Sequence, residues 1–278
     1  MSGSVVCFVV PTKNSARTIE ACLRSIRDQE GGDVELVVVD NHSTDGTEKA
    51  ARRLADLVIS AGPERSAQRN LGAGAGGGDH VVFIDSDMVL EPQIARQVRQ
   101  AFAADPRAGA LVLPELAFGD GFWARCREAE KRLYLGDSRV EAARAFRRRA
   151  FEEAGGYDTG LTGVEDWDLP DRIRRSGWVI GRVEARVHHD EGHLDLRETF
   201  RKKRYYGRTV APYLARHGPV AVGRAARLAL FRKPSRFVRE PAPSFGLVGL
   251  KAVEALGILA GMGDARRAAS RGATGRGA

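Results

Sequence analysis

The stretch Val81-Val-Phe-Ile-Asp-Ser-Asp87 decides how this chain folds, because it joins a short apolar run to two aspartates one residue apart. The apolar run is typical of a buried β-strand, which would deliver both carboxylates to its carboxyl end. Carboxylate oxygens suit a hard divalent cation, and such a cation can hold a diphosphate. Strands often end in aspartate, so the pair alone is a weak signal. Val37-Val-Val-Asp40 upstream and Glu165-Asp166 downstream supply further carboxylates at expected strand or helix ends.

Strands and helices alternate upstream of this stretch. Val5 to Val10 and Glu35 to Val39 are apolar, β-branched runs, and the apolar residues of Ser15 to Gln29 recur at helical spacing. This rhythm predicts a largely parallel sheet with helices on both faces. Ligands of such sheets bind at the carboxyl ends of the strands, where Thr12, Asp40 and Asp85 fall. In the same part of the chain we also expect helices over 43–54 and 65–73 and strands over 57–60 and 81–84.

The glycine-rich segment Gly72 to Gly78 precedes a strand and lacks the Lys-Ser or Lys-Thr ending of a phosphate-binding loop, so we interpret it as a turn. After Glu91 the pattern becomes mixed, and Gly155 and Gly156 stop a helical turn that begins at Phe151. The elements expected in this part are helices over 92–102, 123–135 and 165–176 and strands over 110–114, 142–146 and 178–187, the last strand with His188 and His189 at its end.

Composition indicates one enzyme-sized protein. The chain has 278 residues with 43% hydrophobic content, enough to bury a large core. Its three cysteines fit neither a zinc site nor a disulfide framework, so we expect reduced thiols and a cytoplasmic location. The first apolar run is broken at Pro11 and Lys13, which favours a first strand over a signal peptide.

Charge is distributed unevenly along the chain. Residues 1–195 carry 26 Lys and Arg against 32 Asp and Glu, net −6, whereas residues 196–278 carry 18 against 4, net +14. A strongly basic tail predicts an anionic partner: nucleic acid, acidic lipid head groups or a phosphorylated acceptor.

Six short motifs, in order and at matching spacing, resemble the family 2 glycosyltransferases of the GT-A fold, and the resemblance covers residues 5 to about 217. The chain departs from the common pattern at Asn41, where many members have a second aspartate, and at Ser15, where an acidic residue is common. Asn41 can both donate and accept hydrogen bonds, which leaves the nucleotide base open. The matching motifs are Val10-Pro-Thr-Lys-Asn14, Val39-Asp-Asn-His-Ser-Thr-Asp-Gly46, Arg69-Asn70, Asp85-Ser-Asp87, Gly155-Gly-Tyr-Asp158 and Glu165-Asp166.

The resemblance implies an α/β catalytic domain over 1–195, with a mixed, mostly parallel, Rossmann-like sheet flanked by helices. Its nucleotide-binding part would span about 1–90 and its acceptor part about 91–195, followed by a basic helical extension over 196–278. The implied reaction moves a sugar from a nucleoside-diphosphate sugar to an acceptor hydroxyl with inversion. A glycan or lipid-linked acceptor of the cell envelope is expected, and a nucleic-acid partner is not.

The resemblance also implies roles for single residues. Asp87 would ligate Mn²⁺ or Mg²⁺ directly, Asp85 would contact ribose or metal, and His189 would be the third ligand, although His188 is adjacent and either histidine can point inward. Asp166 would be the catalytic base that deprotonates the acceptor, with Glu165 orienting it. The residues expected to bind the nucleotide are Pro11, Thr12, Asn14, Asp40, Asn41, Arg65, Arg69, Asp85 and Ser86.

The basic tail leaves alternatives open. Thr199 to Gly207 places four consecutive cations before two tyrosines, which is typical of a solvated helix face, a diphosphate clamp or a dock for lipid phosphate. Phe245 to Gly263 is apolar but interrupted by Lys251 and Glu254, so we expect an interfacial or partner-packing helix in preference to a membrane span. Together with the basic segment 231–237, it suggests peripheral attachment at the inner face of the cell membrane.

Two other classes of function compete with glycosyl transfer. A sugar-phosphate nucleotidyltransferase would have a similar sheet, but it needs a glycine-rich, basic loop after the first strand, and Pro11 to Ser15 contains no glycine. A non-catalytic polyanion binder would explain the tail but not the carboxylates of the first 195 residues.

Overall fold

The computed structural model describes residues 4–137, 140–218 and 241–274. The chain folds into two compact units. The first unit comprises 1–116, 135–159 and 165–190, and we call it the catalytic unit. The second comprises 117–134, 160–164 and 191–278, and we call it the helical unit.

A seven-stranded sheet forms the centre of the catalytic unit, in the order β3-β2-β1-β4-β8-β6-β9. Strand β8 runs antiparallel to β4 and β6, and the other pairings in this sheet are parallel. The expected mixed, mostly parallel sheet is therefore confirmed. The strands are β1 Val6–Thr12, β2 Val34–Asp40, β3 Leu57–Ser60, β4 His80–Phe83, β6 Ala108–Val112, β8 Ala143–Arg147 and β9 Val179–Arg182.

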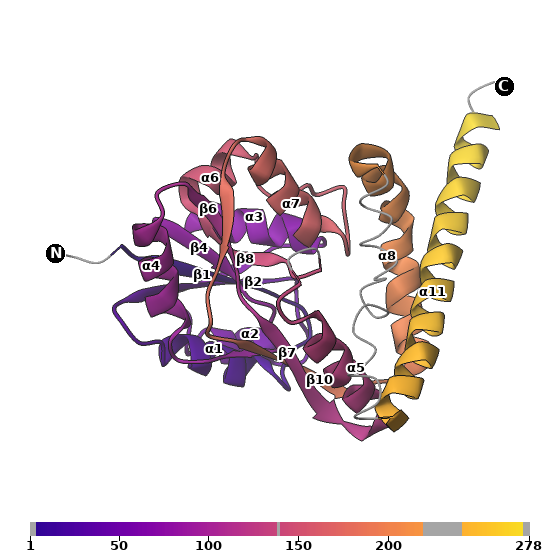
Figure 1. The fold of residues 1–278 in the computed structure, drawn as a ribbon, viewed down its shortest axis with the longest axis horizontal. Helices are drawn as coiled ribbons and strands as arrows, with labels where there is room; N and C mark the ends of the chain where they lie inside the picture. The colour runs from indigo at the N-terminus through magenta and orange to yellow at the C-terminus, as the bar shows by residue number, and fades with distance from the viewer. Residues whose placement is uncertain (1–3, 138–139, 219–240, 275–278) are drawn as a thin grey trace. The chain divides into compact units, whose positions relative to one another are not determined.

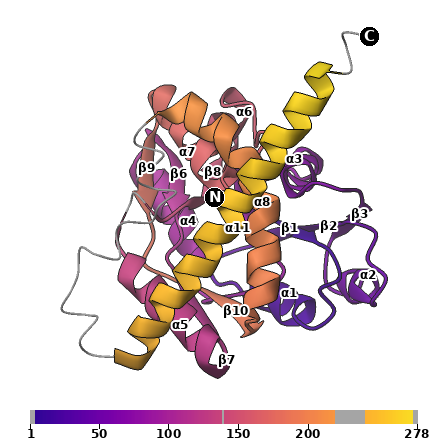
Figure 2. The same ribbon diagram turned by 90° about the vertical axis from the view of Figure 1, so that its right-hand side faces the viewer.

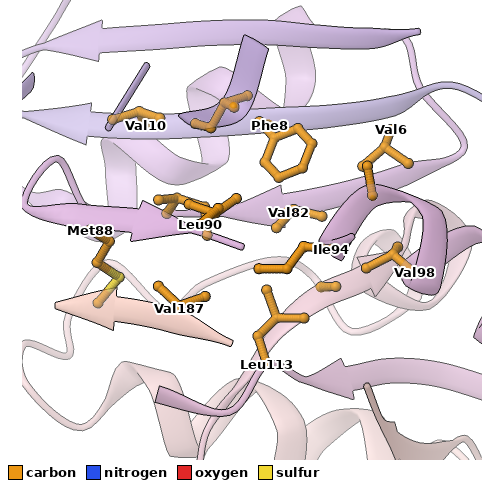
Figure 3. Close-up of a cluster of buried hydrophobic side chains, with 14 of the residues drawn as sticks. Val6, Phe8, Val10, Val82, Met88, Leu90, Ile94, Val98, Leu113 and Val187 are labelled. Atoms are coloured by element: carbon orange, nitrogen blue, oxygen red, sulfur yellow. The ribbon is translucent and has the colours of Figure 1, made fainter. Parts of the chain in front are cut away.

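Helices cover both faces of this sheet because its central strands are apolar on both sides. Phe8 and Val10 of β1 point into one cluster and Cys7 and Val9 into the other. Figure 3 shows the first cluster, in which Ile94 packs near Phe8 and Val82. On that face lie α1 Ile19–Arg27, α2 Thr47–Ala51 and α4 Ile94–Ala104, and on the other face lie α3 Arg65–Ala75, α6 Arg148–Glu153 and α7 Glu165–Arg175 (Figure 1).

Helix α3 runs through the first part of the glycine-rich segment, so the turn predicted over Gly72 to Gly78 was wrong for that part. A Cβ atom on Gly72 would lie 2.3 Å from a side-chain carbon of Val9. Glycine is required here for close packing of the helix on the sheet, and no turn is needed. The helix ends at Ala75, one residue before Gly76.

The single strand predicted over 178–187 was also wrong, because two strands in different sheets occupy this region. The side chain of Gln97 accepts hydrogen bonds from the backbone N–H groups of Glu184 and Ala185, at 2.8 and 2.9 Å, and so fixes the chain between them. A small second sheet has the order β5-β10-β7, and β10 pairs antiparallel with β5. Its strands are β5 Met88–Leu90, β7 Glu115–Asp120 and β10 Val187–His193, so both histidines lie within a strand.

The helical unit contains α5 Gly121–Tyr134, α8 Leu196–His217 and α11 Pro241–Thr274. Helix α11 packs along α8 and against α5 (Figure 2). The approach is close, because a Cβ atom on Gly257 would lie 2.8 Å from the carbonyl oxygen of Phe200. The side chain of Asp195 caps α8 by accepting from two backbone N–H groups. The predicted C-terminal helical extension is confirmed for the described residues; segment 231–237 lies outside them.

A buried ion cluster joins the three helices of this unit. Arg127 of α5 pairs with Glu130 of the same helix and, at 2.5 Å, with Glu254 of α11. Lys251 pairs with both glutamates, and Lys203 of α8 lies 3.4 Å from Glu254. The two charges that interrupt the apolar tail are therefore neutralised inside the helical unit, as expected for a packed helix. By length and composition alone, the segment Phe245–Ala268 of α11 could also cross a membrane.

Candidate active site

Asp85 follows strand β4 and faces three arginines. Its carboxylate accepts from Arg69 Nη2 at 2.8 Å and from Arg144 Nη1 at 3.4 Å, and Arg65 Nη1 lies 3.9 Å away. Arg69 is fully buried, and Arg144 is nearly so. Asp85 is thus a carboxylate surrounded by three arginines at the carboxyl end of the sheet.

Asp166, in the first turn of α7, meets the same arginine. Arg69 Nη1 donates to Asp166 at 2.7 Å, so one guanidinium bridges Asp85 and Asp166. The neighbouring Glu165 is buried and pairs with Arg65 at 2.8 Å. The structure therefore brings together the predicted base, one predicted metal or ribose ligand and both predicted arginines. It also gives Arg69 a bridging role that sequence did not suggest; direct contact of Arg69 with a nucleotide stays a prediction.

Electrostatics keep both aspartates ionised. Burial alone would raise the pKa of Asp85, but Arg69, Arg65 and Arg144 hold it well below its usual range. Burial likewise opposes ionisation of Asp166, and Arg69 and Arg144 lower its pKa. A carboxylate that is ionised at neutral pH can accept a proton, which is the state that a general base requires.

The motifs Arg69-Asn70 and Gly155 to Asp158 hold each other in place. The side chain of Asn70 donates to the carbonyl oxygen of Tyr157 and accepts from its backbone N–H, both at 2.8 Å. Gly156 has φ +67°, and a Cβ atom there would lie 2.7 Å from Asn70. The Arg69 guanidinium lies 5.0 Å from the Tyr157 ring centroid. The Asn70–Tyr157 hydrogen bonds therefore also help to position the bridging arginine.

The predicted nucleoside residues gather where β1 and β2 end. Thr12 lies opposite Asp40 in the parallel register, and Asn41 N donates to Thr12 O at 2.8 Å. Pro11 is buried one residue earlier in β1, and Asn14, with φ +48°, follows in the loop.

Hydrogen bonds fix the loops at these strand ends. Asp40 accepts from the N–H and hydroxyl of Ser43, three residues along the chain, at 2.8 and 2.5 Å, and Asn41 donates to Pro63 O at 2.9 Å. Ser86 donates from its hydroxyl to Ser15 Oγ at 2.8 Å, which ties the loop after β4 to the loop after β1. These turn roles are compatible with contact to a ligand.

The structure distinguishes the two adjacent histidines. Nε2 of His189 lies 3.1 Å from Asp87 Oδ2, and its Nδ1 lies 2.9 Å from Glu115 Oε1. His188 instead meets Glu91 at 3.3 Å. His189 is therefore the histidine beside the Asp-x-Asp pair. Burial opposes its protonation, but the hydrogen bonds with Asp87 and Glu115 raise the pKa of His189 to about 10.

Two carboxylates and one imidazole suit Mn²⁺ or Mg²⁺ as a donor set. The described part of the chain contains no group of three such side chains already gathered around one point. Asp85 is held by arginines, whereas Asp87 and His189 pair with each other. The donors fit the cation chemically, and the metal ligation stays a prediction.

Sequence reasoning missed Arg144 and Glu115. Arg144 lies on β8 between buried apolar neighbours and contacts both Asp85 and Glu115, the latter at 3.1 Å. A charged residue inside an apolar strand was the only signal for it. Glu115 had no signal, because its partners are 29 and 74 residues away in sequence.

A GT-A-type sheet with an Asp-x-Asp pair after its fourth strand and a second acidic pair at the start of α7 is the architecture of a nucleotide-sugar-dependent glycosyltransferase. The chain belongs to glycosyl transferase family 2, whose sequence model matches residues 7–158. This confirms the family inferred from the motifs and decides against the nucleotidyltransferase and polyanion-binder alternatives. Family 2 proteins are sugar-transferring enzymes by class.

Proteins of similar sequence are consistent with this family. The chain is 29% identical over 252 residues to the pre-mycofactocin glycosyltransferase of Mycobacterium tuberculosis, an alignment that covers 81% of this chain and 51% of the relative. It is 26% identical over 197 residues to the succinoglycan biosynthesis protein ExoA of Rhizobium meliloti, covering 62% and 59%. The chain thus spans about half the length of the mycobacterial relative.

Solved structures agree on the fold. The mannosyltransferase PcManGT of Pyrobaculum calidifontis, solved with GDP-Man and Mn²⁺, matches with TM-score 0.66 and 21% identity over 93% of this chain and 87% of that chain. The glucosyl-3-phosphoglycerate synthase of M. tuberculosis, solved with Mn²⁺, UDP and glucosyl-3-phosphoglycerate, matches with TM-score 0.51 and 26% identity over 76% and 80%.

Proposed function

We propose that this protein transfers a glycosyl group from a nucleoside-diphosphate sugar to an acceptor hydroxyl, with inversion and with a divalent cation. The observation that carries the proposal is the convergence of Asp85 and Asp166 on Arg69. This convergence supports a single site in which Asp85 would act on the donor side and Asp166 as the base. Family membership supports the same class of reaction.

Asp87, His189 and Asp85 would hold Mn²⁺ or Mg²⁺ in this proposal. The cation, when bound, supplies a Lewis acid that stabilises the charge of the diphosphate leaving group. Asp166 would take the proton of the acceptor hydroxyl. Because one such carboxylate suffices for direct displacement, the anomeric configuration would invert.

The nucleoside would bind at the ends of β1 and β2. Thr12 Oγ1 is buried there and has no hydrogen-bond partner among the described residues, so a ligand hydroxyl or base edge would satisfy it. Two structural neighbours bind GDP-Man and UDP, which makes guanine and uracil the bases to test first. Asn41 would contact the base as donor or acceptor.

The acceptor would be a glycan or lipid-linked molecule of the cell envelope, reached from the cytoplasmic face. Relatives named for succinoglycan and O-antigen biosynthesis support this class of acceptor. Helix α11 also supports attachment to an anionic membrane: four large apolar side chains among its described residues are exposed and recur at helical spacing, in a tail of net charge +14. These side chains are Phe245, Val248, Leu256 and Leu259.

A thermal-shift panel tests the proposal. UDP, GDP, ADP and CDP are each added with and without Mn²⁺ or Mg²⁺, because a ligand that binds only the native state raises its stability. We expect one diphosphate to raise the Tm only when the cation is present. Equal shifts with and without cation for all four nucleotides would contradict metal-dependent donor binding. Detection of nucleotide release from the matching sugar donor then tests transfer.

A further inference from the structure

Two adjacent histidines of β10 each pair with a different glutamate, and only one pair lies at the candidate metal site. The His189 side chain is 17% exposed and lies between Asp87 and Glu115. The His188 side chain is 36% exposed and meets Glu91. The two pairs have similar chemistry, so any difference in function comes from what else each glutamate and histidine contacts.

Each carboxylate oxygen of Glu115 has its own partner. Its Oε1 meets His189 Nδ1 at 2.9 Å, and its Oε2 accepts from Arg144 Nη2 at 3.1 Å. Arg144 in turn reaches Asp85 at 3.4 Å. Both ends of this chain of contacts are therefore predicted metal ligands, and Glu115 and Arg144 lie between them.

We propose that Glu115 is a positioning residue of the metal site: it accepts the Nδ1–H of His189, so that Nε2, after releasing its own proton to solvent, is the nitrogen that ligates the cation. A neutral imidazole has one N–H and one lone pair, and the partner of the N–H decides which nitrogen can ligate. Nε2 is the nitrogen that faces Asp87, at 3.1 Å. A carboxylate on the far nitrogen also makes the ligating nitrogen more basic. The inference rests on the proposed metal-dependent function.

The structure explains why Glu115 has this role and Glu91 does not. Glu91 accepts from the backbone N–H of Arg186 at 2.8 Å and meets His188, and neither contact leads to an aspartate of the Asp-x-Asp pair. Glu91→Gln is therefore a matched control. It changes a glutamate that pairs with a histidine of the same strand, without touching the His189 contacts.

Mn²⁺ affinity, measured without nucleotide by the EPR signal of the free ion, tests the inference. We expect Glu115→Ala to weaken Mn²⁺ binding about 10- to 100-fold, the range for loss of such an outer partner. Glu115→Gln should weaken it less but in the same direction, and Glu91→Gln should bind as wild type. A shift of the Mn²⁺ activation constant, with kcat restored at saturating Mn²⁺, would separate positioning from general damage.

The electron spin-echo signal of bound Mn²⁺ gives a second readout, since a ligating imidazole nitrogen modulates it. We expect this modulation in wild type and a weaker one in Glu115→Ala. Unchanged affinity and modulation in both Glu115 variants, with Asp87→Ala inactive in metal binding, would overturn the inference and leave the proposed function intact. Wild-type Mn²⁺ binding by Asp87→Ala would overturn both. If Glu115→Ala does not fold, Glu115→Gln decides, because it preserves size and can still accept from Arg144.

Discussion

Each unit of the protein contains a buried arginine between two carboxylates, but the two clusters differ in exposure. In the catalytic unit Arg69 bridges Asp85 and Asp166, whose side chains are 16% and 28% exposed. In the helical unit Arg127 bridges Glu130 and Glu254, whose side chains are 0% and 6% exposed. A carboxylate that keeps part of its surface open can meet a ligand, whereas a fully enclosed one can act only on its neighbours.

Buried charge alone therefore does not mark an active site. Removing two charges from water is costly, and a buried pair rarely adds net stability over apolar packing. In the helical unit the ion cluster links α11 to α5 and α8. In the catalytic unit the same kind of contact keeps Asp85 and Asp166 ionised and in place. Substitutions should therefore damage chemistry in one cluster and stability in the other.

The largest effect is expected on turnover in the catalytic cluster. Asp166→Asn should lower kcat by about 10²- to 10⁴-fold, because it removes the carboxylate that we propose as the base for the acceptor hydroxyl. Donor affinity by calorimetry and the free energy of unfolding should change little, since Asn can still accept from Arg69. Near-wild-type turnover would remove Asp166 from the mechanism.

The helical cluster should respond through stability. Glu254→Ala leaves the buried Arg127 and the partly buried Lys251 without one of their carboxylates, so we expect a loss of about 3–5 kcal/mol in urea unfolding. The control is Glu128→Ala, which breaks an exposed pair with Arg132 on the same helix as Arg127 and should cost at most about 0.5 kcal/mol. Equal losses in the two variants would show that the cluster does not hold α11.

His80 is a buried titratable group without a compensating ion pair of this kind among the described residues, and burial is the main effect that opposes its protonation. Burial and then Arg147 lower the pKa of His80 to about 4. Between about pH 6.5 and pH 4 the unfolded chain binds a proton that the folded chain does not. The free energy of unfolding should therefore be highest above pH 6.5 and fall by roughly 3 kcal/mol or less as the pH drops to 4.

The control for this pH effect is His80→Phe, which preserves stacking on Phe102 and cannot titrate. Urea unfolding from pH 4 to 7 should show a flatter slope for this variant. Parallel slopes for variant and wild type would assign the acid sensitivity to other groups.

The smallest effect concerns the exposed face of α11. Replacing Phe245, Leu256 and Leu259 by serine should reduce sedimentation with anionic vesicles at low salt, since each exposed apolar side chain that enters a bilayer adds to the attraction of nearby cations. Stability should change by less than about 1 kcal/mol, in contrast to Glu254→Ala. Equal vesicle recovery for wild type and the triple variant would make α11 a packing element only.

Sequence predicted the elements that depend on local pattern. The apolar runs gave β1, β2 and β4, and the motif residues Asp40, Asp85 and Asp166 fell at strand or helix ends as expected. The break between β9 and β10 could not be predicted, because it depends on Gln97 bonding to a segment 87 residues away. Gly72 of α3 lies in a glycine-rich run that resembles a turn in sequence, although its close packing on Val9 explains the glycine.

The candidate site, like the fold, was predicted only in part from the sequence. The motifs supplied the aspartates and the arginines but not their pairing, since Arg69 is 97 residues from Asp166. Arg144 and Glu115 come from two strands with no motif, and only the fold brings them to Asp85 and His189. Which of two adjacent histidines faces Asp87 depends on the register of β10, which periodicity does not fix.

Metal-dependent donor binding through Asp87 is decided by calorimetric titration of UDP or GDP in the presence of Mn²⁺, on wild type and on Asp87→Ala. We expect wild type to bind one diphosphate with an affinity that EDTA removes, and Asp87→Ala to show no metal-dependent binding while its Tm stays near that of wild type. The reason is that removing a hard oxygen ligand leaves the diphosphate charge poorly compensated. Mn²⁺-dependent binding of the same affinity in Asp87→Ala would contradict this role of Asp87 and the metal site built on it.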